Sequence, residues 1–290
     1  MNRHNYIAND YPKSTYQDHF QEKSHRLTTM PLLNFHLLRL KDDIQPHTFL
    51  THLQQADPSI KVIVASKPRH FVVKATTQDA DILNKPWDLM LLLQGSKDSL
   101  PHSVLQHISS KYSLPVGVPG KLLSAYPEKN ARLIKEAPSA GLTGSLDNPK
   151  MPDSSQNLEL SPDMLEFMEQ LLKEHDGPVT MLNLLKFKPN GKQSYYQYGQ
   201  HFIEVAGKRG GDAKIVGNVI AADGEKAGWQ EISIVHYASI KHFADMLAGE
   251  DYQAINEKYR LQVSVWGERF IRLHLIMADL NMLRLWRIRY

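Results

Sequence analysis

Residues Val179 to Lys188 read VTMLNLLKFK, and this short stretch does most to decide the fold. It is a compact apolar run between turn-forming residues, which predicts a buried β-strand. Upstream, Ser161 is suited to cap a helix that Pro162 would begin and Gly177 would end. The second half of the chain is therefore expected to open with a helix and a strand.

Downstream, the pattern continues with a helix from about Tyr195 to Lys208. Two strands are expected next, over 213–221 and 229–237, and Ser239 is placed to cap a further helix that stops at Gly249. The order strand, helix, strand, strand, helix is most of a ferredoxin-like unit.

The first half echoes the second. Leu33-Asn34-Phe35 matches Leu182-Asn183-Leu184, and Trp87 matches Trp229 in the same order. Each tryptophan opens a strand that runs into an amphipathic helix. These matches indicate an internal duplication.

The other elements of the first half are less regular. We predict strands over 32–40 and 87–93 and a helix over 46–53. Residues 60–65 and 70–74 read as two strands joined by a hairpin at Ser66–Arg69, and Ser99 as the cap of a helix that extends to Tyr112.

Four regions follow from these patterns. Residues 1–29 form a polar tail, 30–135 a first ferredoxin-like domain, 136–160 a linker rich in Pro, Gly and Ser, and 161–290 a second ferredoxin-like domain with an atypical C-terminal tail. The expected fold class is α+β, with the two domains forming an intrachain dimeric α/β-barrel and the linker outside both.

Composition excludes several classes of protein. The chain has no cysteine, so it has no disulfides or thiolate chemistry and fits a reducing, cytoplasmic location. No secretory signal or 20-residue apolar segment is present, which argues against a membrane. A net charge of +3 with interspersed signs argues against nucleic acid as a partner.

The second half also resembles a known family. The motif Met181 to Phe187, followed by Tyr195, Tyr198 and Gly211, then the strand ending His236-Tyr237-Ala238-Ser239 and Asp251-Tyr252-Gln253, is similar to a small domain of unknown function. That family belongs to the dimeric α/β-barrel superfamily, together with antibiotic-biosynthesis monooxygenase-like and EthD-like proteins. The resemblance covers about 160–260 and implies two four-stranded sheets packed through their open faces, but no particular reaction.

Alternation along the strands selects candidate site residues. Leu182/Leu184 and Ile232/Ile234 suit packing beneath helices. This assigns the following residues to the open sheet faces: Asn34, His36 and Trp87 in the first half, and Asn183, Phe187, Trp229, Glu231 and Ser233 in the second.

His36 and Glu231 are the candidate catalytic pair, because an imidazole and a desolvated carboxylate can transfer protons. The other open-face residues are candidate ligand contacts. Purely structural roles remain open: Asn183 as a partner for buried backbone groups, Glu231 in an inter-domain ion pair, and His236, Tyr237 and Tyr252 either packed or at a pocket mouth. No motif indicates a metal or a cofactor.

Two functions remain open. One is a small-molecule-binding protein acting as a cofactor-independent enzyme of specialised metabolism (isomerase, cyclase, lyase or oxygenase). The other is a non-catalytic binding or assembly module. A small organic molecule is the expected partner, and a homo-oligomer is left open.

The end of the chain allows two interpretations. Ile271, Leu273 and Leu275 alternate with Arg272 and His274, which suits the missing fourth strand. Alternatively, Val263 to Met282 is a translated intron, since Val263-Ser264 matches a common splice donor read in frame. In that case one sheet edge would be open. Sequencing the transcript distinguishes the two.

Overall fold

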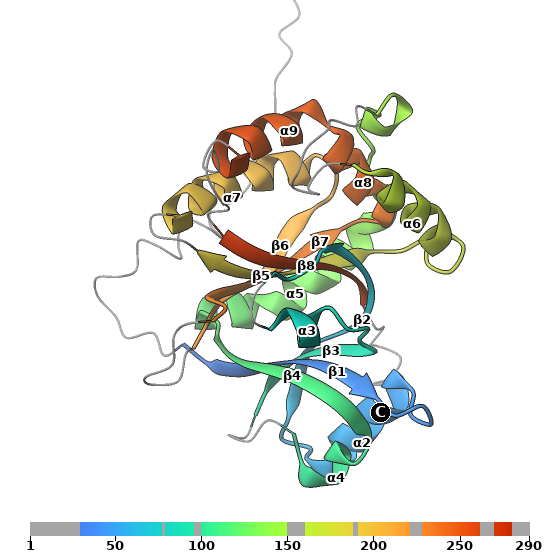
Figure 1. Ribbon diagram of the computed structural model, residues 1–290, viewed down its shortest axis with the longest axis vertical. Coiled ribbons are helices and arrows are strands. Elements are labelled where there is room, and N and C mark those ends of the chain that lie inside the picture. The colour runs from blue at the N-terminus through green and yellow to red at the C-terminus, as the bar shows by residue number, and fades with distance from the viewer. Residues whose placement is uncertain are drawn as a thin grey trace, which may run out of the picture.

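The computed structural model describes residues 30–76, 79–95, 100–149, 160–187, 191–220, 228–261 and 270–279, with only the backbone described for 260, 261 and 270–279. It is an α+β fold in which the strands form a barrel and most of the helices lie outside it (Figure 1).

The first half contributes four strands, three short helices and one long one. These are β1 (Leu32–Leu40), α2 (Pro46–Ala56), β2 (Lys61–Val73), α3 (Ala80–Leu83), β3 (Leu89–Gln94), α4 (His102–Leu105), β4 (Ile108–Gly117) and α5 (Gly120–Glu136). Two single 3₁₀ turns, η1 (Ala137–Ser139) and η2 (Ser145–Asp147), follow.

The second half repeats the plan with longer helices. Its elements are α6 (Pro162–Leu172), β5 (Val179–Phe187), α7 (Gly191–Gly207), β6 (Asp212–Val219), β7 (Glu231–Tyr237), α8 (Ile240–Ala248), α9 (Glu250–Asn256), a π-helical turn η3 (Glu257–Leu261) and β8 (Phe270–Asp279). The caps agree with the sequence: Ser161 accepts a hydrogen bond from the Met164 amide, and Ser239 accepts one from the Lys241 amide.

The eight strands form one closed antiparallel barrel in the order β1-β3-β2-β8-β5-β7-β6-β4. Within each half the strands have the same order, β4-β1-β3-β2 and β8-β5-β7-β6. The halves join where β2 pairs with β8 and where β4 pairs with β6. The sequence predicted two sheets that face each other in a barrel, and the edges of the two sheets also pair, which leaves no unpaired edge strand among the described strands.

The barrel interior is filled by apolar side chains from both halves. Leu33, Phe35 and Leu37 of β1 belong to the same buried cluster as Leu182 and Leu184 of β5. Residues of α3 and α5, among them Leu83 and Tyr126, join this cluster. The shared core holds the two halves together as one body.

A second buried layer lies outside the barrel, between strands and helices. In the second half, Met181 and Leu185 pack against α7 and α8. In the first half, Leu89 and Leu91 pack against Phe49 of α2. Figure 1 shows α7, α8 and α9 on one side of the barrel and α2 and α4 on the other.

Two sequence-based elements are wrong. The helix expected from Ser99 to Tyr112 ends at Leu105, and β4 begins at Ile108. The hairpin expected at Ser66–Arg69 is absent, because β2 runs straight through it. Beyond Ser66 this strand leaves β3 and pairs with β8, and a register shift next to Pro68 accommodates the proline, which lacks an amide hydrogen.

The C-terminal strand β8 takes the position of the missing fourth strand. It pairs with β5 from Phe270 to Ala278 and with β2 on its other side. The intron hypothesis implied an open edge at this place, whereas the described residues close it. Part of the segment in question, 263–269 and 280–282, lies outside the described residues.

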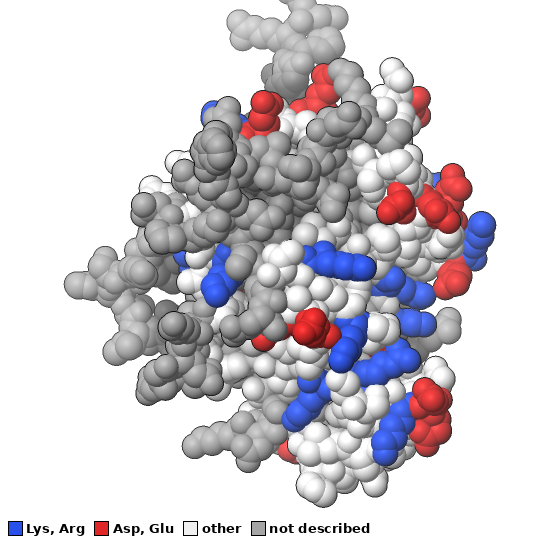
Figure 2. Space-filling view, viewed as in Figure 1, with Lys and Arg blue, Asp and Glu red and all other residues white. Residues whose placement is uncertain are grey.

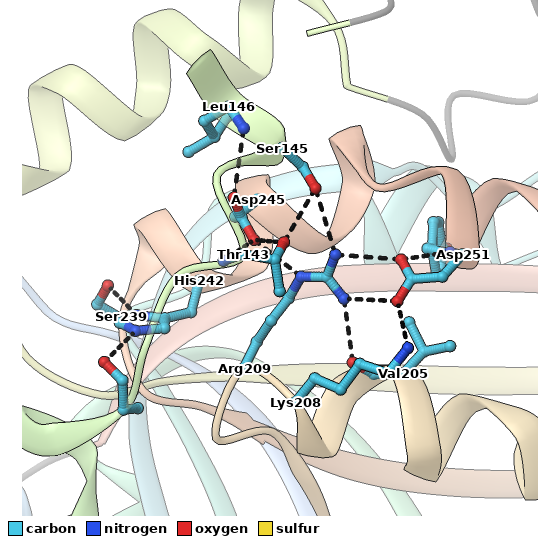
Figure 3. A network of polar contacts seen from close by, with 12 residues as sticks. Thr143, Ser145, Leu146, Val205, Lys208, Arg209, Ser239, His242, Asp245 and Asp251 are labelled. Atoms are coloured by element: carbon cyan, nitrogen blue, oxygen red, sulfur yellow. Dashed lines mark hydrogen bonds and ion pairs between the residues drawn. The ribbon is translucent and has the colours of Figure 1, made fainter. Parts of the chain in front are cut away.

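Residues 137–149, which belong to the expected linker, pack against the second half of the chain and do not lie outside both halves. Arg209 is 1% exposed and Asp245 is completely buried, and they form an ion pair with 2.8 Å between Nε and Oδ2 (Figure 3). The backbone amide and hydroxyl of Thr143 donate to the same carboxylate at 3.0 and 2.6 Å. Asp251 completes the network by accepting from the Arg209 guanidinium. This network fixes the segment against α7, α8 and α9.

Charge also links the halves. Figure 2 shows acidic side chains over α6 and basic ones over the neighbouring part of the barrel. Across this boundary Arg69 of β2 donates to Glu174 at 3.1 Å, and His70 stacks on Phe167 of α6 with 4.3 Å between ring centroids. The exposed ion pair adds little stability, so these contacts mainly set the orientation of α6.

Candidate functional site

The strand faces are the reverse of those expected from the sequence. Leu182 and Leu184 point into the barrel, whereas Asn183 lies on the outer face beneath the helices. The sequence could not distinguish the faces because both are apolar: the barrel takes one aliphatic set, and the helices cover another of equal hydrophobicity, including Met181 and Leu185.

Four of the eight predicted site residues nevertheless lie together on this outer face. Asn183 and Ser233 are directly opposite each other on β5 and β7, and the Asn183 amide nitrogen donates to the Ser233 hydroxyl at 3.1 Å. Glu231 is the next residue on the same face of β7, opposite Leu185. Phe187 packs against the same core.

The other four do not join them. Trp87 and Trp229 are buried in the barrel interior. Asn34 and His36 lie on β1 in the first half, where the His36 Nδ1 and the Ser113 hydroxyl share a hydrogen bond of 2.7 Å. Strands β4 and β6 separate His36 from Glu231, so the catalytic pair expected from the sequence does not form.

His36 is instead a buried imidazole that shares a hydrogen bond with Ser113. Burial, with a smaller effect from the positive charge of Lys111, lowers its pKa to about 4, so it is neutral at physiological pH. Its Nε2 has no hydrogen-bond partner in the described part of the chain. The carboxylate expected beside it, Glu231, is on the other half of the barrel, so the predicted acid–base pair does not form.

A cavity of about 50 Å³ lies between the outer face of the second-half sheet and helices α7, α8 and α9. Asn183 and Ser233 form its polar floor. Its walls are mainly aromatic and aliphatic: Val72, Met181, Tyr195, Tyr198, Gly199, Phe202, Ala213, Val235, Tyr237, Phe243, Met246, Leu247 and Tyr252. Apolar walls with a few polar groups are typical of a small-molecule site.

Among the described residues of the cavity wall, Gly199 is the one without a side chain. It is buried in the middle of α7, on the wall between Tyr195 and Phe202. Glycine inside a helix costs about 0.5–1 kcal/mol relative to alanine, so its presence here is unfavourable for the helix itself.

Glu231 is a desolvated carboxylate two residues from Ser233 on β7, and it is not among the described residues that line the cavity. It is 7% exposed, and burial raises its pKa to about 7 even though Lys192 of α7 opposes the shift. The Lys192 ammonium lies 3.9 Å from the carboxylate and donates to Asn218 at 3.2 Å. The ion pair is within the second half and not between domains. A carboxyl with such a pKa can accept or donate a proton near neutral pH.

The sequence missed part of this site. Tyr195, Tyr198 and Phe202 read as an ordinary helix face, and they do pack, but they also form the cavity wall. Tyr237 and Tyr252, for which both a packed and a pocket position were open, line the cavity. The signal in the sequence that could have indicated a cavity was Gly199, a glycine within an apolar helix face.

Neither a metal cluster nor a membrane span is seen where the structure is described. In those residues no group of three or more His, Asp or Glu side chains is arranged to hold a metal ion. None of the helices there has the length and apolar character to cross a bilayer.

Comparisons with known proteins give no family. No family model matches the chain, and no curated protein matches it. The resemblance of residues 160–260 to a domain of unknown function therefore stays an interpretation of its motifs.

Two kinds of solved structure are similar in part. A protein of unknown function from Rhodopseudomonas palustris has 23% identity and a TM-score of 0.30, over 39% of this chain and 94% of that one. A mutant chlorite dismutase from Candidatus Nitrospira defluvii has 11% identity and a TM-score of 0.38, over 87% of this chain and 93% of that one. Both TM-scores are below 0.5, so neither the fold nor the function described here is based on them.

Proposed function

We propose that this protein binds a small, largely apolar organic molecule in the cavity beneath α7, α8 and α9, with the Asn183 and Ser233 side chains as its polar contacts. The observation that carries the proposal is a cavity lined by apolar side chains, by the polar pair Asn183 and Ser233, and by the buried Gly199 in the middle of α7. An uninterrupted apolar core would place a larger residue there, as interiors are close-packed.

We also propose that the two halves are tandem ferredoxin-like domains, 30–135 and 161–290, of the dimeric α/β-barrel superfamily. The identical strand order in the halves supports this relation. So does the repeat, because Asn34 and Asn183 lie on the equivalent strands β1 and β5, and Trp87 and Trp229 immediately precede β3 and β7.

The size of the cavity restricts the ligand. Benzene occupies an engineered cavity of about 150 Å³, three times this volume. A ring of about six or seven heavy atoms therefore fits only if the walls move apart, and we expect compact rings to bind before larger molecules. Larger ligands require α9 to move away from α7.

The test uses cyclopentanone and phenol as probes, followed by protein-observed NMR. Gly199→Val should abolish binding because its side chain occupies the cavity. Gly207→Val is the matched control: it is on the same helix, but a Cβ at Gly207 meets no atom within 4 Å, so binding should be unchanged. Binding that survives in Gly199→Val contradicts the proposal.

A second candidate function is proton transfer on the bound molecule. It is favoured by Glu231, which is two residues from Ser233 on the same strand face and has a pKa near 7. The carboxylate would remove a proton from the carbon next to a carbonyl group, and return of a solvent-derived proton to that carbon would restore the ketone. Cyclopentanone in D₂O should then exchange its α-hydrogens faster with the wild-type protein than with Glu231→Gln. Equal rates exclude this activity and leave binding alone.

A further inference from the structure

The strand β8, of which the backbone is described, passes beneath the cavity. It lies between β5 and β2 in the barrel. Met181 and Asn183 of β5 line the cavity on one side of β8, and Val72 of β2 lines it on the other side. A residue of β8 that is on the same sheet face and in register with these positions therefore belongs to the cavity floor.

The pairing register identifies this residue as His274. Its backbone is directly opposite Asn183 of β5. On its other side it pairs with Val73 of β2, and the register of that pairing shifts at Val72. Ser233 of β7 is opposite Asn183 in turn. Because neighbouring strands are about 4.8 Å apart, His274 lies one strand from Asn183 and two strands from Ser233.

Strand alternation places His274 on the outer face of the sheet. Leu275 is directly opposite Leu182, which belongs to the barrel interior. The preceding residue, His274, is therefore on the opposite face, as Asn183 is. The floor of the cavity thus has a histidine, an asparagine and a serine in one row on three adjacent strands.

A histidine adds a group that the described lining of the cavity lacks. No Lys, Arg, His, Asp or Glu is among the described residues that line it. The amide of Asn183 already donates to the hydroxyl of Ser233 at 3.1 Å. A neutral imidazole offers one unprotonated nitrogen, a basic hydrogen-bond acceptor. The complementary ligand group is a weakly acidic hydroxyl, because it donates a hydrogen bond to this nitrogen.

We propose that His274 is the third polar residue of the cavity floor and accepts a hydrogen bond from an acidic hydroxyl group of the ligand, as in a phenol or an enol. This inference rests on the proposed function. It narrows the small apolar ligand to one with a hydroxyl group on an unsaturated carbon. A carboxylate is disfavoured, because the described lining brings no permanent positive charge to an apolar site.

The test compares phenol with fluorobenzene, a ring with the same number of heavy atoms and no hydrogen-bond donor. Dissociation constants are measured by protein-observed NMR at pH 8, where an ordinary histidine is neutral. In the wild-type protein, the imidazole ¹⁵N signals of His274, assigned through bonds to its backbone, should shift saturably with phenol. The same signals should stay in place with fluorobenzene, which offers the imidazole no proton.

Two variants on the same strand face identify the group responsible. In His274→Leu the affinity for phenol relative to fluorobenzene should fall about tenfold, the effect of one hydrogen bond, while fluorobenzene still binds. Arg272→Leu is the matched control. Arg272 is the neighbouring position on this face of β8, and it is opposite Leu185, which is not among the described residues that line the cavity. Its relative affinity should equal that of the wild type.

The outcomes separate this inference from the proposed function. If His274→Leu keeps the wild-type preference, if the imidazole signals of His274 do not respond to phenol, or if only cyclopentanone binds, the role of His274 is wrong while binding in the cavity stands. The imidazole signals are read in the wild type, so they decide even if His274→Leu does not fold. If phenol, fluorobenzene and cyclopentanone all fail to bind to the wild type, both are wrong.

Discussion

Replacing Glu231 by glutamine should stabilise the protein at alkaline pH and leave it unchanged at acidic pH. In the folded protein the pKa of this carboxyl is about 7, against 4.5 when it is exposed. The folded state therefore holds the proton more tightly than the unfolded state between these values. Stability falls as pH rises through this window and is lowest above pH 7.

The magnitude follows from the size of the shift. A difference of about 2.5 pKa units corresponds to about 3 kcal/mol, reached only above pH 7, where Glu231 is ionised in both states. Glutamine removes this burial cost, while the loss of the 3.9 Å contact with Lys192 reduces the gain. We expect Glu231→Gln to be more stable by about 1–3 kcal/mol at pH 8 and equal to the wild type at pH 4.5.

The assay is urea unfolding at pH 4.5, 6, 7 and 8. Glu204→Gln is the control, because Glu204 is an exposed carboxylate on α7 and its replacement should shift all four values equally or not at all. A Glu231→Gln variant that is less stable at pH 8 than at pH 4.5, relative to the wild type, would refute the reasoning. It would mean that the ion pair with Lys192 outweighs desolvation.

Three further predictions concern other parts of the fold. Because the pKa of His36 is lowered to about 4, the unfolded state takes up a proton below pH 6.5 and the folded state does not. Wild-type stability should therefore fall by up to about 3 kcal/mol between pH 6.5 and 4, and this pH dependence should vanish in His36→Gln. Parallel pH profiles of the two proteins in urea unfolding would exclude this. Arg209→Leu leaves the fully buried Asp245 carboxylate without its ion pair and should cost about 3–5 kcal/mol in urea unfolding, whereas a loss below about 1 kcal/mol would show that the network is not stabilising. Ser161→Ala removes the N-cap of α6 and should cost about 1 kcal/mol, and an unchanged melting temperature would contradict the role of the cap.

The second half was predictable from the sequence because its signals are local. Ser161 and Ser239 cap the helices that their positions predicted, and the stretch beginning at Val179 forms the predicted strand. In the first half, Leu100, Val104 and Ile108 fit a helix, but β4 begins at Ile108, where Leu40 of β1 provides a partner. Pairing with distant strands cannot be seen in a local pattern.

The site was predictable as a set of residues but not in its position. Asn183, Glu231 and Ser233 do lie together, because strand alternation correctly groups them on one face. The choice between inner and outer face depends on how the barrel closes, which is a property of all eight strands.

Amide chemical-shift mapping with cyclopentanone tests the central claim most directly, because the barrel interior and the outer cavity contain different residues. The account predicts saturable shifts at Gly199, Ser233 and Tyr252, with the indole N–H signals of Trp87 and Trp229 unchanged. Shifts confined to the two indoles would place the ligand inside the barrel and contradict the account, as would the absence of any saturable shift.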